Sequence, residues 1–283
     1  MRLVVSGASG QLGRLVVARL LESVAIEDLI LVSRSPGSLE WLAKLGASVR
    51  HGDFDRPESL PAAFEGGRRA LIISTLGSAD TVAGHRAAFH AAAKAGVSRI
   101  VYTSVTNPVA DNPFPAAKTH VASERDLRET GVPWTILRNS LYAELRARIG
   151  AKYIEDGRWT TNTGDGAHAF VARTDCAAAA AAALTGAGHD GRIYDITGPE
   201  LIDARSYTAL LEEFGGRSIV RDDVDDETYE RYRAAFAADP DNAAYFELYG
   251  GTGRAIRTGY LDVLGTGVRE LLGREPIALR ELF

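Results

Sequence analysis

The chain has 283 residues, of which 46% are hydrophobic and 24% charged, and its formal net charge is −5. This length and apolar content predict a large core and a main domain joined to a smaller lobe. The negative charge and the lack of a Lys/Arg stripe disfavour nucleic acid as a partner, and a single cysteine, Cys176, excludes a disulfide framework and a cysteine zinc site.

The first predicted element is a short strand at residues 3–5, which runs through a glycine-rich turn into an amphipathic helix at residues 12–21. Such a turn aims backbone N–H groups and the positive end of a helix dipole at one spot, which suits a pyrophosphate. The alternative is a strand–turn–helix without a ligand, but strand, turn, helix and position in the chain all favour a dinucleotide site. The predicted contacts in the turn are Gly7, Ser9, Gly10, Gln11, Leu12 and Gly13.

The second strand, residues 29–32, is followed by Ser33-Arg34-Ser35. Arg34 thus comes 27 residues after Gly7. Folds that bind NAD carry an acid near this point for the ribose 2′-hydroxyl, whereas a 2′-phosphate calls for a cation with a planar fork of donors. No acid stands beside Arg34. The sequence therefore favours NADP(H) over NAD(H), the alternative being an arginine that is merely solvated.

Strand and helix patterns then alternate, with strands at 48–51, 70–73, 99–102 and 134–137 and helices at 57–64, 79–95 and 116–129. This alternation predicts an α/β protein with a Rossmann-type, doubly wound parallel sheet. Ligands of such sheets bind beyond the carboxyl ends of the strands. Further cofactor contacts are therefore expected at Asp53, Phe54, Ser74, Thr75, Gly77, Thr103, Ser104 and Asn139.

After residue 140 the pattern changes. Residues 153–163 are turn-rich, Asp175 is predicted to cap an alanine-rich helix that Gly186 ends, and a strand follows at 192–196. The rest predicts helices with glycine breaks. We expect an NADP(H)-binding domain at 1–140, completed by about 171–196, and a smaller C-terminal α/β substrate lobe at 141–170 and 197–283.

Metal and membrane sites are not predicted. The acidic run at 222–227 suits either a divalent metal or, as we favour, a helix N-terminus. The six histidines show no ligand spacing. The most apolar stretch, residues 176–184, is too short to cross a bilayer, and no targeting segment is recognised, so the cytoplasm is the expected compartment.

Several of these motifs occur in the same order in a known family. The glycine turn, Arg34, Tyr102-Thr-Ser104, His120 with Glu124, and Leu137-Arg-Asn139 resemble the NmrA-like group of atypical short-chain dehydrogenases. The chain looks closest to the branch of NADPH-dependent quinone oxidoreductase type 2 and triphenylmethane reductase. The resemblance implies a Rossmann domain, NADP(H) and reduction of a quinone-like acceptor or dye. Some members of the group bind the dinucleotide as regulators without turnover, so a non-catalytic NADP(H) sensor is the alternative.

The usual catalytic acid is absent. Short-chain dehydrogenases use Tyr-x-x-x-Lys, and the nearest segment here is Phe114-Pro-Ala-Ala-Lys118, in which Phe114 has no proton to give. The candidates for assisting groups are His120, Tyr102, Ser104, Asn139 and Tyr142. His120, Tyr102 and Tyr142 each have a structural alternative: a satisfied helix histidine, a core ring, and packing between lobes, respectively.

A conjugated acceptor needs the acid less than a ketone does, because hydride addition gives a stabilised product. The expected partner is therefore a small-molecule acceptor, without nucleic acid or membrane. The oligomeric state that we consider for this protein is a homodimer.

Overall fold

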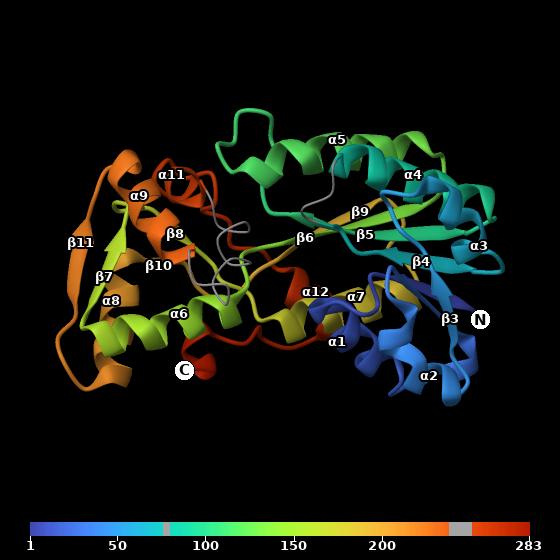
Figure 1. The fold of residues 1–283 in the computed structure, drawn as a ribbon, viewed down its shortest axis with the longest axis horizontal. Coiled ribbons are helices and arrows are strands. Elements are labelled where there is room, and N and C mark those ends of the chain that lie inside the picture. The colour runs from blue at the N-terminus through green and yellow to red at the C-terminus, as the bar shows by residue number, and fades with distance from the viewer. Residues whose placement is uncertain (76–79, 238–250) are drawn as a thin grey trace.

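In residues 1–75, 80–237 and 251–283, which the computed structural model describes, seven parallel strands form the central sheet (Figure 1). Their order is β3-β2-β1-β4-β5-β6-β9, so the chain turns back between β1 and β4. This confirms the predicted doubly wound α/β fold, and ligands bind at such a reversal. The strands are β1 (Leu3–Ser6), β2 (Leu29–Ser33), β3 (Ser48–His51), β4 (Arg69–Ile72), β5 (Arg99–Val105), β6 (Trp134–Asn139) and β9 (Arg192–Ile196).

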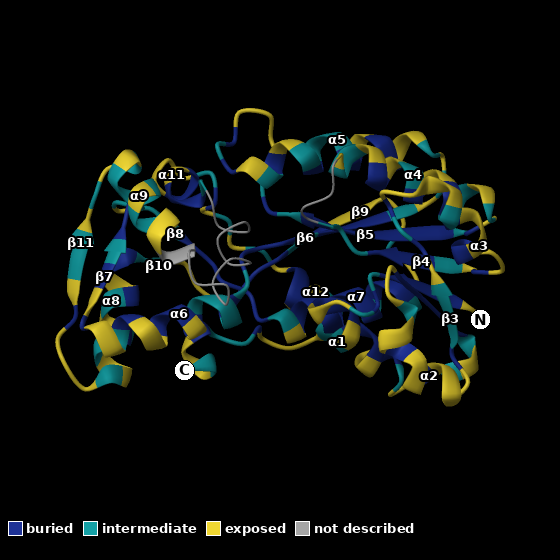
Figure 2. Cartoon of the chain, in the orientation of Figure 1, coloured by how far each residue is buried: buried dark blue, intermediate teal, exposed yellow. Residues whose placement is uncertain are grey.

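Helices cover both faces of the sheet, which explains why its central strands β1, β2 and β4 are largely apolar and buried. Leu3 and Val5 of β1 belong to the core with α1 and α7, whereas Val4 belongs to the core with α3 and α4. Figure 2 shows the central strands buried and the outer helix faces exposed. One layer holds α3 (Leu60–Phe64), α4 (Thr81–Lys94) and α5 (Pro115–Glu129), and the other holds α1 (Gln11–Leu20), α7 (Arg173–Thr185) and α12 (Gly267–Leu272), with α2 (Glu40–Lys44) at the edge.

The prediction that Asp175 caps the alanine-rich helix is wrong. The N-cap of α7 is Ala172, and Asp175 lies inside the first turn, fully buried. Its carboxylate accepts hydrogen bonds from Arg274 Nη2 at 2.6 Å and from the Ile277 N–H at 2.7 Å. The acid therefore anchors a segment of chain about a hundred residues away, which no local pattern could reveal.

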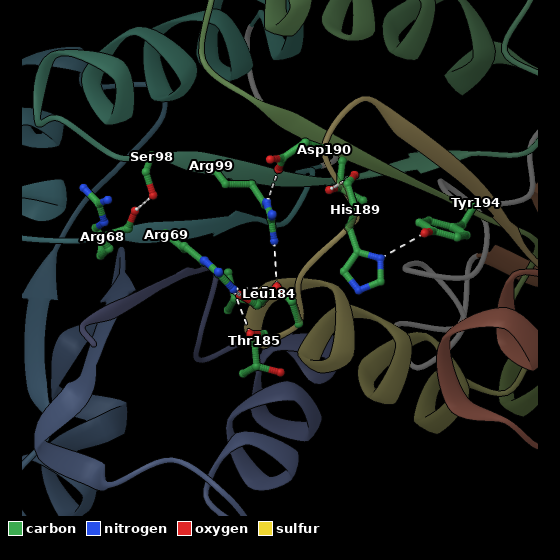
Figure 3. Close-up of polar contacts among 11 residues, drawn as sticks. Arg68, Arg69, Ser98, Arg99, Leu184, Thr185, His189, Asp190 and Tyr194 are labelled. Atoms are coloured by element: carbon green, nitrogen blue, oxygen red, sulfur yellow. Dashed lines mark hydrogen bonds and ion pairs between the residues drawn. The ribbon is translucent and has the colours of Figure 1, made fainter.

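The other end of α7 is held by two arginines from the amino edge of the sheet (Figure 3). Arg69 Nη1 donates to the carbonyl oxygens of residues 184–186, at 2.7–2.9 Å. Arg99, which is paired with Asp190, donates to the carbonyl oxygen of Gly186. Cations at a helix C-terminus satisfy carbonyl groups that lack intrahelical partners.

The second group of elements surrounds a separate apolar cluster that includes Trp159, Tyr207 and Leu211. Phe114, the N-cap residue of α5, and Ala117 within this helix join the cluster, so the cluster packs directly on the helix layer that covers the sheet. Its elements are α6 (Ala143–Asp156), β7 (Arg158–Thr161), β8 (Ala167–His168), β10 (Ile202–Asp203), α8 (Ala204–Gly215), β11 (Val220–Asp223), α9 (Asp226–Ala237) and α11 (Thr252–Arg257).

Three local predictions need correction in this part of the chain. Residues 153–163 are not turn-rich, because α6 continues to Asp156 and β7 then pairs in parallel with β11. The acidic run 222–227 is divided: Asp222 and Asp223 lie in β11, whereas Asp225 accepts from the Thr228 N–H at 2.7 Å and the last two acids begin α9, so the predicted helix N-terminus is confirmed for the second half only. Residues 267–272 fall within the predicted substrate lobe, yet α12 packs against α7.

Candidate functional site

The three glycines of the motif, two in the loop after β1 and the third in the first turn of α1, have different roles. Gly7 has a φ of +64°, a conformation that other residues rarely adopt. A Cβ on Gly13 would lie 2.1 Å from the Gly7 carbonyl oxygen, so α1 packs on the loop only without a side chain there. Gly10 is the N-cap of α1 with an ordinary φ of −73°, and no side chain caps the helix. The first-turn N–H groups of α1 are thus available to an anion such as a pyrophosphate.

Arg34 stands at the end of β2, exposed and on the wall of the same site. No hydrogen bond or ion pair holds its guanidinium within the described residues. The loop beneath it is fixed by Ser33, whose Oγ lies 2.7 Å from Ser9 Oγ and accepts from the Ser35 N–H at 3.0 Å. A free guanidinium on a fixed loop suits a phosphate ligand.

Asp53 and Phe54 follow β3 and form the adjacent wall. The Asp53 N–H donates to Ser59 Oγ at 2.9 Å, and Asp53 Oδ1 accepts from the Asp55 N–H at 3.1 Å. Phe54 is largely buried, with its ring edge-on to His85 at 6.2 Å between centroids. These two hydrogen bonds hold the loop after β3 in a fixed turn, which forms this wall of the site.

The opposite end of the site follows β4, β5 and β6. The Ser74 N–H donates to Thr103 Oγ1 at 2.8 Å, so Thr103 supports the wall from behind. Two buried atoms of wall residues, Thr75 Oγ1 and Asn139 Oδ1, have no hydrogen-bond partner among the residues that the structure describes. Buried polar atoms are normally paired, so these two mark where polar groups of a ligand fit. Gly77 lies outside the described residues.

One pocket of about 680 Å³ brings most of the predicted residues together. Tyr102 and Thr103 do not line it. The predicted residues on its wall are Gly7, Ser9, Gly10, Gln11, Leu12, Gly13, Arg34, Asp53, Phe54, Ser74, Thr75, Ser104, His120, Asn139 and Tyr142.

Tyr102 lies behind the wall, fully buried, with its Oη 2.9 Å from His120 Nδ1. Burial raises the pKa of the Tyr102 phenol, which keeps it protonated. Burial, with the neighbouring His85, lowers the pKa of His120 to about 3, so its imidazole is neutral at physiological pH. Tyr102 therefore does not contact the pocket itself but contacts His120, which lines it.

Tyr142 is the N-cap residue of α6, where the chain leaves the sheet. The Arg173 guanidinium lies 4.5 Å from the centre of its ring. Burial is the main cause that raises the pKa of the Tyr142 phenol. The ring therefore acts as a neutral aromatic wall.

The sequence interpretation missed the contribution of α6. Glu144, Leu145 and Arg148 line the pocket, as does Arg173 at the start of α7. Leu145 and Arg148 are three residues apart and so share a helix face, a signal that the expected change of pattern after residue 140 obscured. Phe114, noted only as lacking a proton, is also on the wall.

No group of three or more His, Cys, Asp or Glu side chains in the described residues is arranged to hold a metal ion. Cys176 is buried in α7, and burial raises the pKa of its thiol. No helix in the described parts of the chain has the length and apolar character that a membrane span requires.

A glycine turn at the reversal of a doubly wound sheet, with a free arginine after β2, defines a dinucleotide-binding α/β protein. A family described as NAD(P)H-binding matches residues 7–187. The chain belongs to this NAD(P)H-binding family, and the expected resemblance to its NmrA-like reductases is confirmed.

Three similar proteins illustrate the relationship. Quinone oxidoreductase 2 of Escherichia coli is 32% identical over 218 residues, covering 77% of this chain and 76% of the relative. Its NADPH complex superposes with a TM-score of 0.89, at 27% identity over 99% of this chain and 97% of that one. An NmrA-like oxidoreductase of Aspergillus flavus is 27% identical over 99% of this chain and 93% of its own. The triphenylmethane reductase of Citrobacter sp. complexed with NADP(H) has a TM-score of 0.89 at 30% identity. The match covers 100% of this chain and 98% of the reductase.

Proposed function

We propose that this protein is an NADPH-dependent reductase that passes hydride to a quinone-like or other conjugated small acceptor. The observation that carries the proposal is the single pocket in which Arg34 and the glycine turn share a cavity with Phe114, Leu141, Leu145 and Tyr142. The first group suits a dinucleotide, and the second is an apolar and aromatic wall suited to a flat conjugated ring. Relatives named as a quinone oxidoreductase and a triphenylmethane reductase support this.

The residues of the site fit NADP(H). The N–H groups at the start of α1 would hold the pyrophosphate, and Arg34 the 2′-phosphate. Thr75 Oγ1 and Asn139 Oδ1, which are buried and have no partner in the described part of the chain, would meet polar groups of the cofactor at the other end. When bound there, NADPH supplies the hydride.

We propose that the lobes share these tasks. Residues 1–140 with about 171–196 would hold the cofactor, and α6 from the smaller lobe would cover the acceptor with Leu145 and Arg148. We keep the cytoplasm as the proposed compartment and a homodimer as the proposed oligomer.

Steady-state oxidation of NADPH in the presence of simple quinones tests the activity directly. A parallel titration with NADPH measures binding. Turnover with at least one quinone is the expected result. Tight NADPH binding without turnover across quinones and triarylmethane dyes would replace this proposal with the NADP(H) sensor.

Arg34→Ala should weaken NADPH binding by about 1.5–3 kcal/mol, because a hydrogen-bonded charge on the 2′-phosphate is lost. NADH has no such phosphate, so its affinity should stay nearly unchanged. Calorimetric titrations with both cofactors measure the difference. Arg56→Ala is the matched control, since Arg56 is exposed nearby but does not line the pocket. Equal losses for NADPH and NADH in Arg34→Ala would show that Arg34 does not contact the phosphate.

Simple ketones and secondary alcohols should be poor substrates. Their reaction needs a proton at the oxygen, and a general acid typically contributes about 10²–10⁴-fold. Phe114 occupies the place of the usual tyrosine, and Lys118 is exposed and away from the pocket. We expect quinone turnover to exceed ketone turnover by at least ~100-fold. Brisk alcohol oxidation would reveal a proton donor elsewhere in the site.

A further inference from the structure

Three buried aromatic side chains and the buried Ser123 hydroxyl form a hydrogen-bonded network behind the pocket. His85 from α4 and Tyr102 from β5 are fully buried, and His120 from α5 is 3% exposed. Tyr102 Oη lies 3.1 Å from His85 Nδ1 and 2.9 Å from His120 Nδ1. His120 alone of the three reaches the pocket wall. These hydrogen-bonded side chains therefore connect the buried core between the sheet and its helices to the pocket.

The backbone fixes the first proton of this network. The Thr75 N–H donates to His85 Nε2 at 3.0 Å, so Nε2 is the acceptor nitrogen of that ring. Burial lowers the pKa of His85 to about 4, and the neutral ring then carries its hydrogen on Nδ1. This hydrogen points to Ser123 Oγ, at 2.9 Å.

The remaining protons follow from that assignment. His85 Nδ1 already bears a hydrogen and cannot accept from Tyr102. Ser123 Oγ, which accepts from His85, has its own hydrogen to donate to Tyr102 Oη. The Tyr102 O–H then donates to His120 Nδ1, and the neutral His120 ring carries its hydrogen on Nε2.

We infer that His120 presents its Nε2–H to the pocket as a fixed hydrogen-bond donor for an acceptor oxygen, and that His85 is the positioning residue that sets this tautomer. The inference deepens the proposed function and rests on it for the substrate. It narrows the favoured substrates to acceptors that gain negative charge on oxygen.

The chemistry separates two acceptor classes. A quinone takes up two electrons and one hydrogen from NADPH, which leaves as NADP⁺. The product is a hydroquinone monoanion, which then gains a proton from water. The charge resides on oxygen, where a neutral N–H stabilises it without giving up its proton. A triarylmethyl cation takes the hydride at its central carbon and gives a neutral product with no charged oxygen. His120 should therefore assist quinones and not such dyes.

The tautomer can be measured without turnover. Nitrogen-15 NMR of histidine-labelled protein distinguishes protonated from bare ring nitrogens, and the His120 signals are those lost in His120→Gln. We expect a protonated Nε2 and a bare Nδ1 in the wild type. Tyr102→Phe should give a mixture of tautomers, whereas His90→Gln, at an exposed site on α4, should not change the His120 signals. A wild-type His120 protonated on Nδ1 would overturn the inference and leave the proposed function standing.

Kinetics test the acceptor class. His120→Leu should lower kcat for a simple quinone by roughly tenfold, the worth of one neutral hydrogen bond. Reduction of a triarylmethane dye should change by less than about twofold, which also shows that the variant is folded and binds NADPH. His120→Gln places an amide N–H near the position of Nε2 and should recover most of the quinone rate.

Two outcomes would contradict this role: equal losses on quinone and dye in His120→Leu, or no recovery in His120→Gln. Absence of turnover by the wild type on any acceptor would instead refute the proposed function, and the NMR result would still decide the tautomer.

Discussion

Gly10→Val is expected to abolish dinucleotide binding while the fold persists. The Gly10 backbone has an ordinary φ of −73°, so valine adopts it without strain. An added Cβ meets only the Gly7 carbonyl oxygen, at 3.2 Å, which a small shift relieves. The branched side chain would, however, stand over the first turn of α1, where the pyrophosphate must approach the N–H groups.

NADPH titration and a thermal melt of the same variant separate the two effects. Replacing glycine by valine at an N-cap should cost about 1 kcal/mol of stability, which leaves the protein folded. Ala18→Val, at an exposed position on the same helix, should bind NADPH like the wild type. Gly7 and Gly13 are unsuitable for this test because changes there strain or collide with the turn itself. Normal NADPH affinity in a folded Gly10→Val protein would refute the location of the pyrophosphate.

Much of the sheet follows from local signals. Each predicted strand from residue 3 to 196 occurs within two residues of its expected start. The central strands give the clearest signal, because strands buried on both faces are apolar runs, and the alternation with helices locates the more polar strand β3. The short strands β7, β8, β10 and β11 were not predicted. β7 and β11 are short and rich in polar residues, and the acids of β11 resembled a helix start. Their pairing depends on contacts between segments about sixty residues apart.

The site divides in the same way. Residues that end a parallel strand can be placed from the sequence, since the carboxyl ends of all strands meet at one edge. The hydrogen-bonded network that links His85 to His120 through Ser123 and Tyr102 cannot, because its members come from different elements and only packing sets their distances. The partners of Glu124 could not be placed from the sequence either. The family resemblance includes Glu124, but its hydrogen-bond partners come from β5 and β6 as well as α5.

Glu124→Gln is expected to destabilise the protein by about 2–4 kcal/mol. Glu124 is 2% exposed. Its carboxylate accepts two hydrogen bonds from Arg138, at 2.9 and 2.8 Å, and one from Arg128 at 3.0 Å. Ser104 Oγ, on the pocket wall, donates to it at 2.8 Å. Glutamine keeps the volume but removes the charge, which leaves two guanidinium groups facing each other across a buried amide. Both arginines are partly exposed, so the loss is smaller than for a fully buried pair.

The pH dependence of unfolding isolates the charge from the packing. Burial alone would raise the pKa of Glu124, but the hydrogen bonds and the charge of Arg138, together with the hydrogen bonds from Ser104 and Arg128, lower it below its usual 4.5. A depressed folded-state pKa gives stability that is complete above the unfolded-state value and is lost as pH falls through the folded-state value. The difference in unfolding free energy between wild type and Glu124→Gln should therefore be constant between about pH 6 and 8 and shrink below about pH 4.

Denaturant titrations at several pH values measure this difference. Glu129→Gln is the matched control on the same helix, since Glu129 is exposed and only 3.7 Å from Arg125, and it should change stability by less than about 0.5 kcal/mol. A Glu124→Gln difference that stays the same down to acid pH would mean that the carboxylate charge is not what stabilises the fold. The loss would then come from the geometry of the amide, and the wall at Ser104 would depend on hydrogen bonding alone.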